Sequence, residues 1–321
     1  MNPTSCTLTT ILVSYNTRHL LDECLAALKA ASATLGETQV IVVDNASRDG
    51  SAEHLEQHHP EAMLIRSPTN VGFGRANNLA LPFVKGQFVL LLNTDAFIAE
   101  DSLTKSLAFL AAHPRCGIVG ARLVGRDGEE QPSARRFPTP LNIFLKRSGL
   151  HRQFRGVPLV DGPQFVPPAA SECDWVPGCY YLIRREVIQQ VGLFDARFFL
   201  YYEEVDHCLA AKRAGWSVVC DPSTSVVHIG GESAKSDGRV SSEGRQVGVI
   251  EIESAFLYFR KNFGAATVIL HLVLDVMADL LIALKSGLNR SESDSLGFRW
   301  RRIKSTVGLC FRTRLGSSPT R

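Results

Sequence analysis

Short apolar runs alternate with helix-like segments through the first ninety-five residues of the chain. The apolar runs predict buried strands at 7–14, 40–43, 62–66 and 88–92. Between them, apolar residues recur every third or fourth position, which predicts helices at 20–28, 51–59 and 74–84. Asn16 or Thr17 is placed to cap the first helix. Strands and helices that alternate in this way are typical of a parallel sheet covered by helices.

Polar side chains follow three of these strands, at the point where each strand ends. The three clusters are Ser14-Tyr15-Asn16, Asp44-Asn45-Ala46-Ser47 and Asn93-Thr94-Asp95. Any one of them is consistent with a simple strand-to-helix turn, where Asn, Asp and Ser are favoured for capping alone. In open parallel sheets, however, ligands bind beyond the carboxyl ends of the strands. Three clusters at the same edge therefore predict a binding site.

The pattern loosens between residues 117 and 168, where prolines and the Arg135-Arg136 pair predict a long loop or mobile insertion. Such segments often shape access to a substrate. Regular structure returns with a predicted strand at 179–183 and a helix at 185–191. Two short strands are expected at 217–220 and 225–229, and the second ends at His228.

The composition is that of an ordinary globular protein, with 45% hydrophobic and 21% charged residues. A net charge of +3 is too small to argue for a nucleic-acid partner. The charge is uneven, because residues 285–321 carry nine Lys or Arg against two acids, a net of +7 that leaves −4 for the remainder. A basic tail after an acidic body predicts contact with an anionic membrane surface.

The eight cysteines form no Cys-x-x-Cys pair and no dense framework, which disfavours a disulfide scaffold or a structural zinc site. We expect reduced and mostly buried thiols. The N-terminus shows no basic stretch followed by an apolar segment and a small-residue cleavage site, so a cytoplasmic location is expected.

Candidate chemistry comes from an isolated acid and an acidic cluster. Asp95 follows an apolar strand and is suited to hold a divalent cation that bridges phosphate oxygens. Glu203, Glu204 and Asp206 stand at the start of a predicted helix, where acids are also favoured by the helix dipole alone. Nearby aromatic residues favour the catalytic interpretation, because they can desolvate a carboxylate and make it a better base; these are Phe198, Phe199, Tyr201 and Tyr202.

His228 has two interpretations. A lone histidine after a strand is more often structural. The adjacent Gly230 and Gly231 would permit close approach of a phosphate or metal ion, which favours a functional role.

In combination, these segments resemble family 2 glycosyltransferases of the GT-A fold, with the bacterial rhamnosyltransferase-like enzymes as the nearest subgroup. The matching motifs run in order from about residue 8 to residue 235. They are Thr10–Asn16 (TILVSYN), Val42–Gly50 (VVDNASRDG), Asn70–Asn78 (NVGFGRANN), Leu91–Asp95 (LLNTD), Trp175–Gly178 (WVPG), Gly192–Asp206 (GLFDARFFLYYEEVD) and Gly215-Trp216.

The resemblance implies an inverting transfer of a sugar from a nucleoside-diphosphate donor, with Mn²⁺ or Mg²⁺ as cofactor. It places the metal at Asp95, assisted by His228, and the catalytic base at Glu204, with Asp206 or Glu203 orienting it or the acceptor. The residues it implies for the nucleotide sugar are Ser14, Tyr15, Asn16, Asp44, Asn77, Asn93, Thr94, Trp175 and Gly178.

Two positions depart from the family pattern. Asn93 stands where the family's metal motif has its first acid, so Asp95 must hold the metal largely without it. Many relatives carry Arg-Asn where this chain has Asn77-Asn78, so the nucleobase contact of that Arg is either supplied by Arg75 or absent.

The segment 265–284 is apolar and long enough to cross a bilayer, but His271, Asp275 and Asp279 form one polar stripe along it. Each central Asp costs about 2.5–3.5 kcal/mol on insertion scales, so an amphipathic helix fits better than a spanning one. Such a helix either packs on the catalytic domain or lies in the membrane interface beside the basic tail.

We therefore expect a GT-A glycosyltransferase domain over 1–262 and an amphipathic helix with a basic tail over 263–321. The expected acceptor is a cell-surface glycan or its polyprenyl-diphosphate-linked precursor, the expected donor sugar is rhamnose from dTDP-rhamnose, and the expected location is the inner face of the plasma membrane. A sugar nucleotidyltransferase is a rival, but the first strand is followed by Ser14-Tyr15-Asn16-Thr17-Arg18 rather than a glycine-rich basic loop. A second rival is a non-enzymatic nucleotide- or membrane-binding protein, in which the acids would only cap helices and face solvent.

Overall fold

The computed structural model describes residues 7–154, 156, 159–160, 167–230, 245–289 and 296–321. Several features used above lie outside these residues: the first six residues, Gly231 beside His228, and the tail charges at positions 290, 292 and 294.

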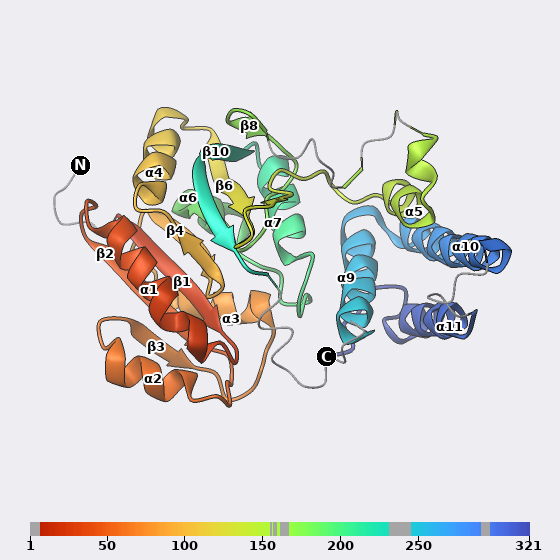
Figure 1. The fold of residues 1–321 in the computed structure, drawn as a ribbon, viewed down its shortest axis with the longest axis horizontal. Helices are drawn as coiled ribbons and strands as arrows, with labels where there is room; N and C mark the ends of the chain where they lie inside the picture. Colours follow the sequence, from red (N-terminus) through yellow and green to blue (C-terminus); the bar gives the residue numbers. More distant parts are fainter. Residues whose placement is uncertain (1–6, 155, 157–158, 161–166, 231–244, 290–295) are drawn as a thin grey trace.

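A mixed sheet forms the centre of the α/β body of the molecule (Figure 1). Its first half is parallel and confirms the four strands predicted in this region. β1 (Leu8–Ser14) lies between β2 (Thr38–Asp44) and β4 (Phe88–Asn93), with β3 (Met63–Arg66) at the edge. Every strand in this half is rich in apolar residues because helices cover both faces of the sheet.

The second half of the sheet introduces antiparallel strands. β9 (Tyr180–Arg184) runs antiparallel to β4 and to β6 (Cys116–Val124), which continues to β10 (Ser217–His228) and β5 (Ala96–Ile98). The short strands β7 (Glu130–Gln131) and β8 (Ser171–Glu172) pair with β6 and β10. This arrangement brings His228, the last residue of β10, opposite Ala96, next to Asp95.

Three local expectations were wrong. The segment 117–168 is not one long loop, because it contains most of β6 and the helix α5 (Pro140–Ser148), which a Thr139–Asn142 capping box begins. The two short strands expected at 217–229 form one strand whose register shifts between Asp221 and Ser225. Neither Asn16 nor Thr17 caps the first helix with its side chain: the Thr17 hydroxyl contacts Ser14 and Thr94, and Asp49 accepts from the Arg18 N–H instead.

Helices cover the two faces of the sheet and enclose two apolar clusters. One cluster lies beneath α1 (Arg18–Ser32), α2 (Ser51–His58) and α4 (Ser102–Ala112). The other lies beneath α3 (Phe73–Ala80), α6 (Arg185–Val191) and α7 (Glu203–Arg213). The described cysteines are buried and unbridged, in agreement with the thiols expected from sequence.

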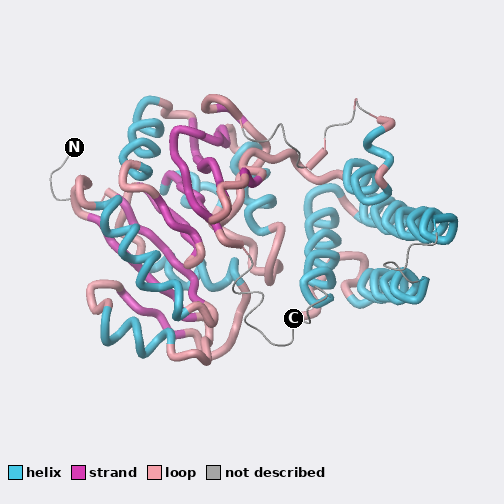
Figure 2. Tube along the Cα trace, viewed as in Figure 1, coloured by secondary structure: helices cyan, strands magenta, loops and turns pink. Residues whose placement is uncertain are grey.

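The C-terminal helices group with α5 beside the α/β body, as Figures 1 and 2 show. They are α9 (Arg245–Phe263), α10 (Ala265–Asn289) and α11 (Leu296–Arg312). Phe256 and Phe259 of α9 belong to the same apolar cluster as α7, so this extension shares a core with the sheet. The predicted boundary at 262/263 falls at the end of α9, and the expected basic tail is largely a packed helix.

Candidate active site

The carboxyl ends of β1, β2 and β4 meet at one edge of the sheet. Ser14 lies opposite Asp44 in the β1–β2 register, and Val13 lies opposite Asn93. Beneath this edge the Ser14 and Thr94 hydroxyls each contact Thr17 Oγ1, at 3.1 and 3.0 Å. These buried hydroxyls hold the first and third polar clusters together.

Asn16 links the first polar cluster to the second. Its backbone adopts a left-handed conformation with φ of 54°. Its amide N–H donates to Ser47 Oγ at 3.0 Å, and its Oδ1 accepts from the Arg48 N–H at 2.7 Å. Tyr15 stands half-exposed between these anchored neighbours.

Asp44 presents one unpartnered oxygen at this edge. Its Oδ2 accepts from the Ser47 N–H at 3.1 Å, while Oδ1 is buried and has no hydrogen-bond partner among the described residues. A buried carboxylate oxygen without a partner is costly, so this atom is poised for a ligand donor such as a ribose hydroxyl or a base N–H.

Asn45 connects the end of β2 to the turn at Asn70, and the sequence analysis missed this role. It donates to Asn70 Oδ1 at 3.0 Å and accepts from the Val71 N–H at 2.9 Å. The next residue, Gly72, has φ of 87°, and an added Cβ would lie 2.2 Å from the carbonyl oxygen of Phe199. Only glycine permits this approach, which joins the Asn70 turn to the segment before α7.

Asp95 and His228 face each other across the end of the sheet. Asp95 is buried, and its Oδ1 lies 3.7 Å from His228 Nε2. This separation is too long for a hydrogen bond. It leaves room for a shared ligand between the two atoms.

Gln131 of β7 sets the tautomer of His228, and sequence reasoning missed it. Its Nε2 donates to the backbone oxygen of His228 at 2.8 Å, so its Oε1 must be the atom that faces His228 Nδ1 at 2.9 Å. Because Oε1 can only accept, Nδ1 carries the proton and Nε2 offers a lone pair toward Asp95. Burial lowers the pKa of His228 and favours the neutral ring, although Asp95 acts in the opposite direction. A neutral, oriented imidazole is the form that metals bind.

Arg135 supplies a positive charge between the metal candidates and the acidic cluster. Its guanidinium lies over the Trp175 ring at 4.9 Å. Its charge acts to lower the pKa of both His228 and Glu204, although burial leaves the pKa of Glu204 above its ordinary value. The Arg135-Arg136 pair was visible in the sequence, but nothing there indicated that a strand-like bridge to Trp175 would bring it into the site.

Glu203 and Glu204 begin α7 after a strained turn. Tyr201 and Tyr202 both have positive φ, 68° and 70°. Such consecutive left-handed residues are costly and cluster at functional sites. Glu204 lies within the electrostatic influence of Arg135, whereas Glu203 packs beside Gly74 of α3.

Both glutamates have an unpartnered oxygen. In each, Oε2 is buried without a hydrogen-bond partner among the described residues. Burial raises the pKa of Glu204, and burial with the Glu204 charge raises the pKa of Glu203 well above its ordinary value. A carboxylate with this environment is a stronger base than a solvated one.

Asp206 is placed differently from the two glutamates. Its Oδ2 accepts from Lys261 Nζ at 2.6 Å and its Oδ1 from Asn262 Nδ2 at 2.8 Å. Both oxygens are thus engaged by α9, which favours a role in joining α7 to the C-terminal helices.

The remaining predicted residues surround the site or support it. Asn77 is buried and donates to the Phe73 carbonyl within α3, and Arg75 donates to the Ala196 carbonyl at 2.6 Å. Trp175 is buried and donates to the Arg136 carbonyl at 2.8 Å, and Gly178 lies against Phe73. These contacts leave their predicted roles toward a nucleotide sugar as predictions.

The mixed sheet with flanking helices is that of the GT-A fold, and Asp44, Asp95 and His228 stand at the ends of its strands or directly after them. Residues 9–166 match the family model for glycosyl transferase family 2, and the chain belongs to this family.

The chain is similar to named rhamnosyltransferases. It is 30% identical over 254 residues to the N-acetylglucosaminyl-diphospho-decaprenol L-rhamnosyltransferase of Mycobacterium tuberculosis, covering 71% of this chain and 77% of that protein. It is 26% identical over 167 residues to the rhamnosyltransferase WbbL of Escherichia coli, covering 49% and 60%. The chain is therefore a glycosyltransferase.

Solved structures support the fold. The mannosyltransferase PcManGT from Pyrobaculum calidifontis, in complex with GDP-Man and Mn²⁺, aligns with a TM-score of 0.55 at 17% identity, covering 98% of this chain and 88% of that one. GalNAc-T7 with UDP, GalNAc and Mn²⁺ aligns with a TM-score of 0.56 at 14% identity, and the chain spans 48% of it.

Proposed function

We propose that this glycosyltransferase moves a sugar, with inversion, from a nucleoside-diphosphate donor to a lipid-linked glycan precursor, and that the sugar is rhamnose from dTDP-rhamnose. The observation that carries the chemistry is that Arg135 acts electrostatically on both Glu204 and His228, whose Nε2 lies 3.7 Å from Asp95 Oδ1. The choice of rhamnose and of the lipid-linked acceptor follows the names of the mycobacterial and E. coli relatives.

The donor would lie across the ends of β1, β2 and β4. Asp44 Oδ1 would accept from the nucleoside, beside Tyr15 and Asn16. Asn93 and Thr94 lie next along this edge. Arg135, whose guanidinium lies over the Trp175 ring, would neutralise the diphosphate.

The residues present fit a divalent cation. Asp95 Oδ1 and the lone pair on His228 Nε2 face each other at 3.7 Å, and Gln131 fixes the imidazole from behind. Mn²⁺ or Mg²⁺ bound there would neutralise charge on the leaving diphosphate. Asp95 and His228 would hold the ion, and Arg135 would supply further positive charge.

Glu204 would take the proton from the acceptor hydroxyl. Its buried Oε2 has no protein partner among the described residues, and its raised pKa brings its basicity closer to neutral pH. Glu203, packed against α3, would hold the first turn of α7 in place.

Donor and acceptor panels test this function. The purified chain is incubated with UDP-, GDP- and dTDP-sugars, with and without Mn²⁺, and with polyprenyl-diphospho-N-acetylglucosamine as acceptor. We expect transfer from dTDP-rhamnose with an inverted anomeric centre, read by NMR of the product. Absence of nucleotide binding under every condition would overturn the proposal, and transfer of another sugar would correct its donor.

The helix α10 has one polar face that is buried and one apolar face that is exposed. Among the described residues it is the one helix long and apolar enough to span a bilayer by length and composition, with a mean hydropathy of 2.2 over an 18-residue window within residues 265–285. Its polar stripe faces inward, where Arg147 of α5 binds Asp279 at 2.8 Å and Arg302 of α11 binds Asp275 at 3.0 Å. Burial alone would raise the pKa of Asp275, but these two arginines hold it below its ordinary value.

The opposite face of α10 is apolar and exposed. Its large side chains are 43–66% exposed; they are Ile269, Leu270, Val273, Met277, Leu280 and Leu284. On α11, Trp300 and Phe311 are exposed beside the charges of Arg301, Lys304 and Arg312. An apolar stripe with a tryptophan and basic residues is typical of a helix that lies in an anionic membrane interface.

We propose that α10 lies on the inner face of the plasma membrane rather than crossing it. Crossing would carry Asp275 and Asp279 into lipid together with arginines from two other helices. Peripheral contact instead leaves this buried network intact and brings the site close to a lipid-linked acceptor.

Vesicle binding tests this orientation. The double variant Val273→Asp/Leu280→Asp should lose binding to phosphatidylglycerol vesicles in co-sedimentation, because it places charges on the lipid-facing stripe. Leu79→Asp, on an exposed position of α3, is the matched control and should bind normally. Undiminished binding by the double variant would contradict the proposed face.

A further inference from the structure

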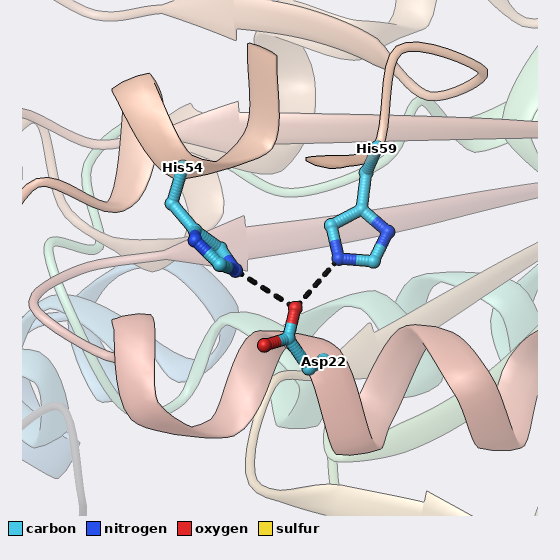
Figure 3. A group of neighbouring side chains, drawn as sticks. All are labelled: Asp22, His54 and His59. Carbon is cyan, nitrogen blue, oxygen red and sulfur yellow. Dashed lines mark hydrogen bonds and ion pairs between the residues drawn. The ribbon is translucent and has the colours of Figure 1, made fainter. Parts of the chain in front are cut away.

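A second group of metal-binding side chains lies on the outside of the molecule, where α1 meets α2. Figure 3 shows Asp22 of α1 facing His54 of α2 and His59 just beyond it. The Nε2 atoms of His54 and His59 lie 2.8 and 2.7 Å from the same oxygen, Asp22 Oδ1. The three side chains place one ligand atom each within 4.8 Å of one another.

This group is separate from the candidate active site. Asp22 is on the solvent side of α1, with 67% of its side chain exposed. Cys24, on the opposite side of the same helix, is buried and contacts the carbonyls of Asn93 and Ala96 beside Asp95. An ion at Asp22 would therefore lie across α1 from the Asp95–His228 pair.

The donor set suits a divalent transition metal. Two imidazole nitrogens and a carboxylate oxygen are ligands that Zn²⁺ takes, with a water in the fourth position. Tetrahedral bonds of about 2.0–2.1 Å separate neighbouring ligand atoms by about 3.3–3.4 Å. To reach this geometry, the distances from the two Nε2 atoms to Asp22 Oδ1 would have to increase by roughly 0.5–0.7 Å. The exposed side chain of Asp22 can rotate to allow this.

The surroundings hold the two rings in place. The side chains of His54 and His59 are only 11% and 15% exposed, and His58 stacks on His54 with ring centroids 4.4 Å apart. On the far side of the second ring, His59 Nδ1 faces the Glu61 carboxylate at 3.8 Å. This separation is too long for a hydrogen bond, but the Glu61 side chain is exposed, and a rotation that closed the gap would orient the imidazole and raise its basicity. An open depression lined in part by His19, Asp22 and His54 gives an ion access from solvent.

An ion bound by this group would restrain the two helices that follow two loops of the candidate active site. α1 begins directly after the Ser14–Thr17 strand end, and α2 begins directly after the Asp44–Gly50 loop. The two loops already touch through Asn16 and through the Arg18 N–H, which donates to Asp49 at 2.8 Å. A metal ion further along the helices would fix α1 to α2 behind these loops.

We propose that Asp22, His54 and His59 bind one divalent transition-metal ion, with Zn²⁺ the best suited, and that this ion clamps α1 to α2. The site is distinct from Asp95 and His228 and does not take part in the transfer reaction. It goes beyond the proposed function and stands whether or not that function is correct.

Cobalt spectroscopy on the full chain, freed of any affinity tag and of metal, tests this site. The variant Asp95→Asn/His228→Gln removes the active-site ligands, so any remaining site is the new one. We expect this variant to bind one Co²⁺ with the visible absorbance of a nitrogen- and oxygen-ligated ion, and Zn²⁺ to displace it. We also expect Zn²⁺ to raise the melting temperature of the wild-type chain.

Further substitutions in the same background identify the ligands. His54→Gln, His59→Gln and Asp22→Asn should each weaken Co²⁺ binding and remove the Zn²⁺-dependent rise in melting temperature. His113→Gln, at an exposed histidine on α4's C-terminal end, should change neither. Circular dichroism in EDTA checks that every variant is folded. Undiminished binding by the ligand variants, or no binding by the parent, would overturn the proposal.

Discussion

Replacement of Gln131 by leucine should weaken metal binding without touching a metal ligand. The amide makes two contacts with His228, at 2.8 and 2.9 Å, and both are lost in Gln131→Leu. His228 is then free to carry its proton on Nε2, where it would point at Asp95 and offer no lone pair. Loss of such an outer partner typically lowers metal affinity about 10- to 100-fold, equivalent to about 1.4–2.8 kcal/mol.

Mn²⁺ titration by calorimetry or electron paramagnetic resonance measures this effect. Gln131→Glu retains an acceptor for Nδ1 and should bind Mn²⁺ more tightly than Gln131→Leu. Gln57→Leu, at an exposed glutamine of α2, is the matched control and should match the wild type. The reasoning would be refuted if Gln131→Leu bound Mn²⁺ normally while His228→Leu lost binding.

Three further predictions concern the rest of the site. Gly72→Ala should lower the free energy of unfolding by about 2–4 kcal/mol in urea titrations, because the added Cβ would lie 2.2 Å from the Phe199 carbonyl oxygen. An unchanged urea midpoint would contradict the close approach of Gly72 to Phe199. Arg135→Met should lower kcat/KM about 10- to 100-fold with weaker nucleoside-diphosphate binding, and normal kinetics would place the guanidinium outside the site. Because the pKa values of Glu203 and Glu204 are raised in the folded chain, the stability that these two groups contribute should be fully present below the unfolded pKa near 4.5 and be lost as pH rises through the folded values. Melting temperatures from pH 4 to 8 should therefore decline less in Glu203→Gln than in the wild type, and parallel curves would contradict the burial of this acid.

The sequence predicted the fold well where the pattern of apolar residues within one strand or helix reflects the burial of that same element. The strands at 7–14 and 88–92 are continuous apolar runs because both faces of the sheet are covered, and the helix at 185–191 was found with its observed bounds. Between 117 and 168 the local signal failed. There β6 was hidden by two glycines, one of which packs its Cα against Val176, and α5 by Pro138 just before it and Pro140 at its first position.

The site was predicted unevenly for a similar reason. Asp44, Asp95 and Glu204 could be placed because each stands at the end of a strand or the start of a helix in a recognisable motif. Gln131 and Arg135 could not, because their roles depend on contacts with His228 and Trp175 that are 97 and about 40 residues away along the chain. The inward turn of α10's polar stripe also depends on distant arginines on α5 and α11.

The central claim is that Glu204 is the base of a transfer reaction at this sheet edge. Its most direct test is single-turnover transfer by Glu204→Gln, measured beside donor binding in the same preparation. We predict that transfer is lost while the dissociation constant for the nucleotide sugar stays near the wild-type value. Wild-type transfer by Glu204→Gln would contradict the account and move the base to Glu203 or Asp206.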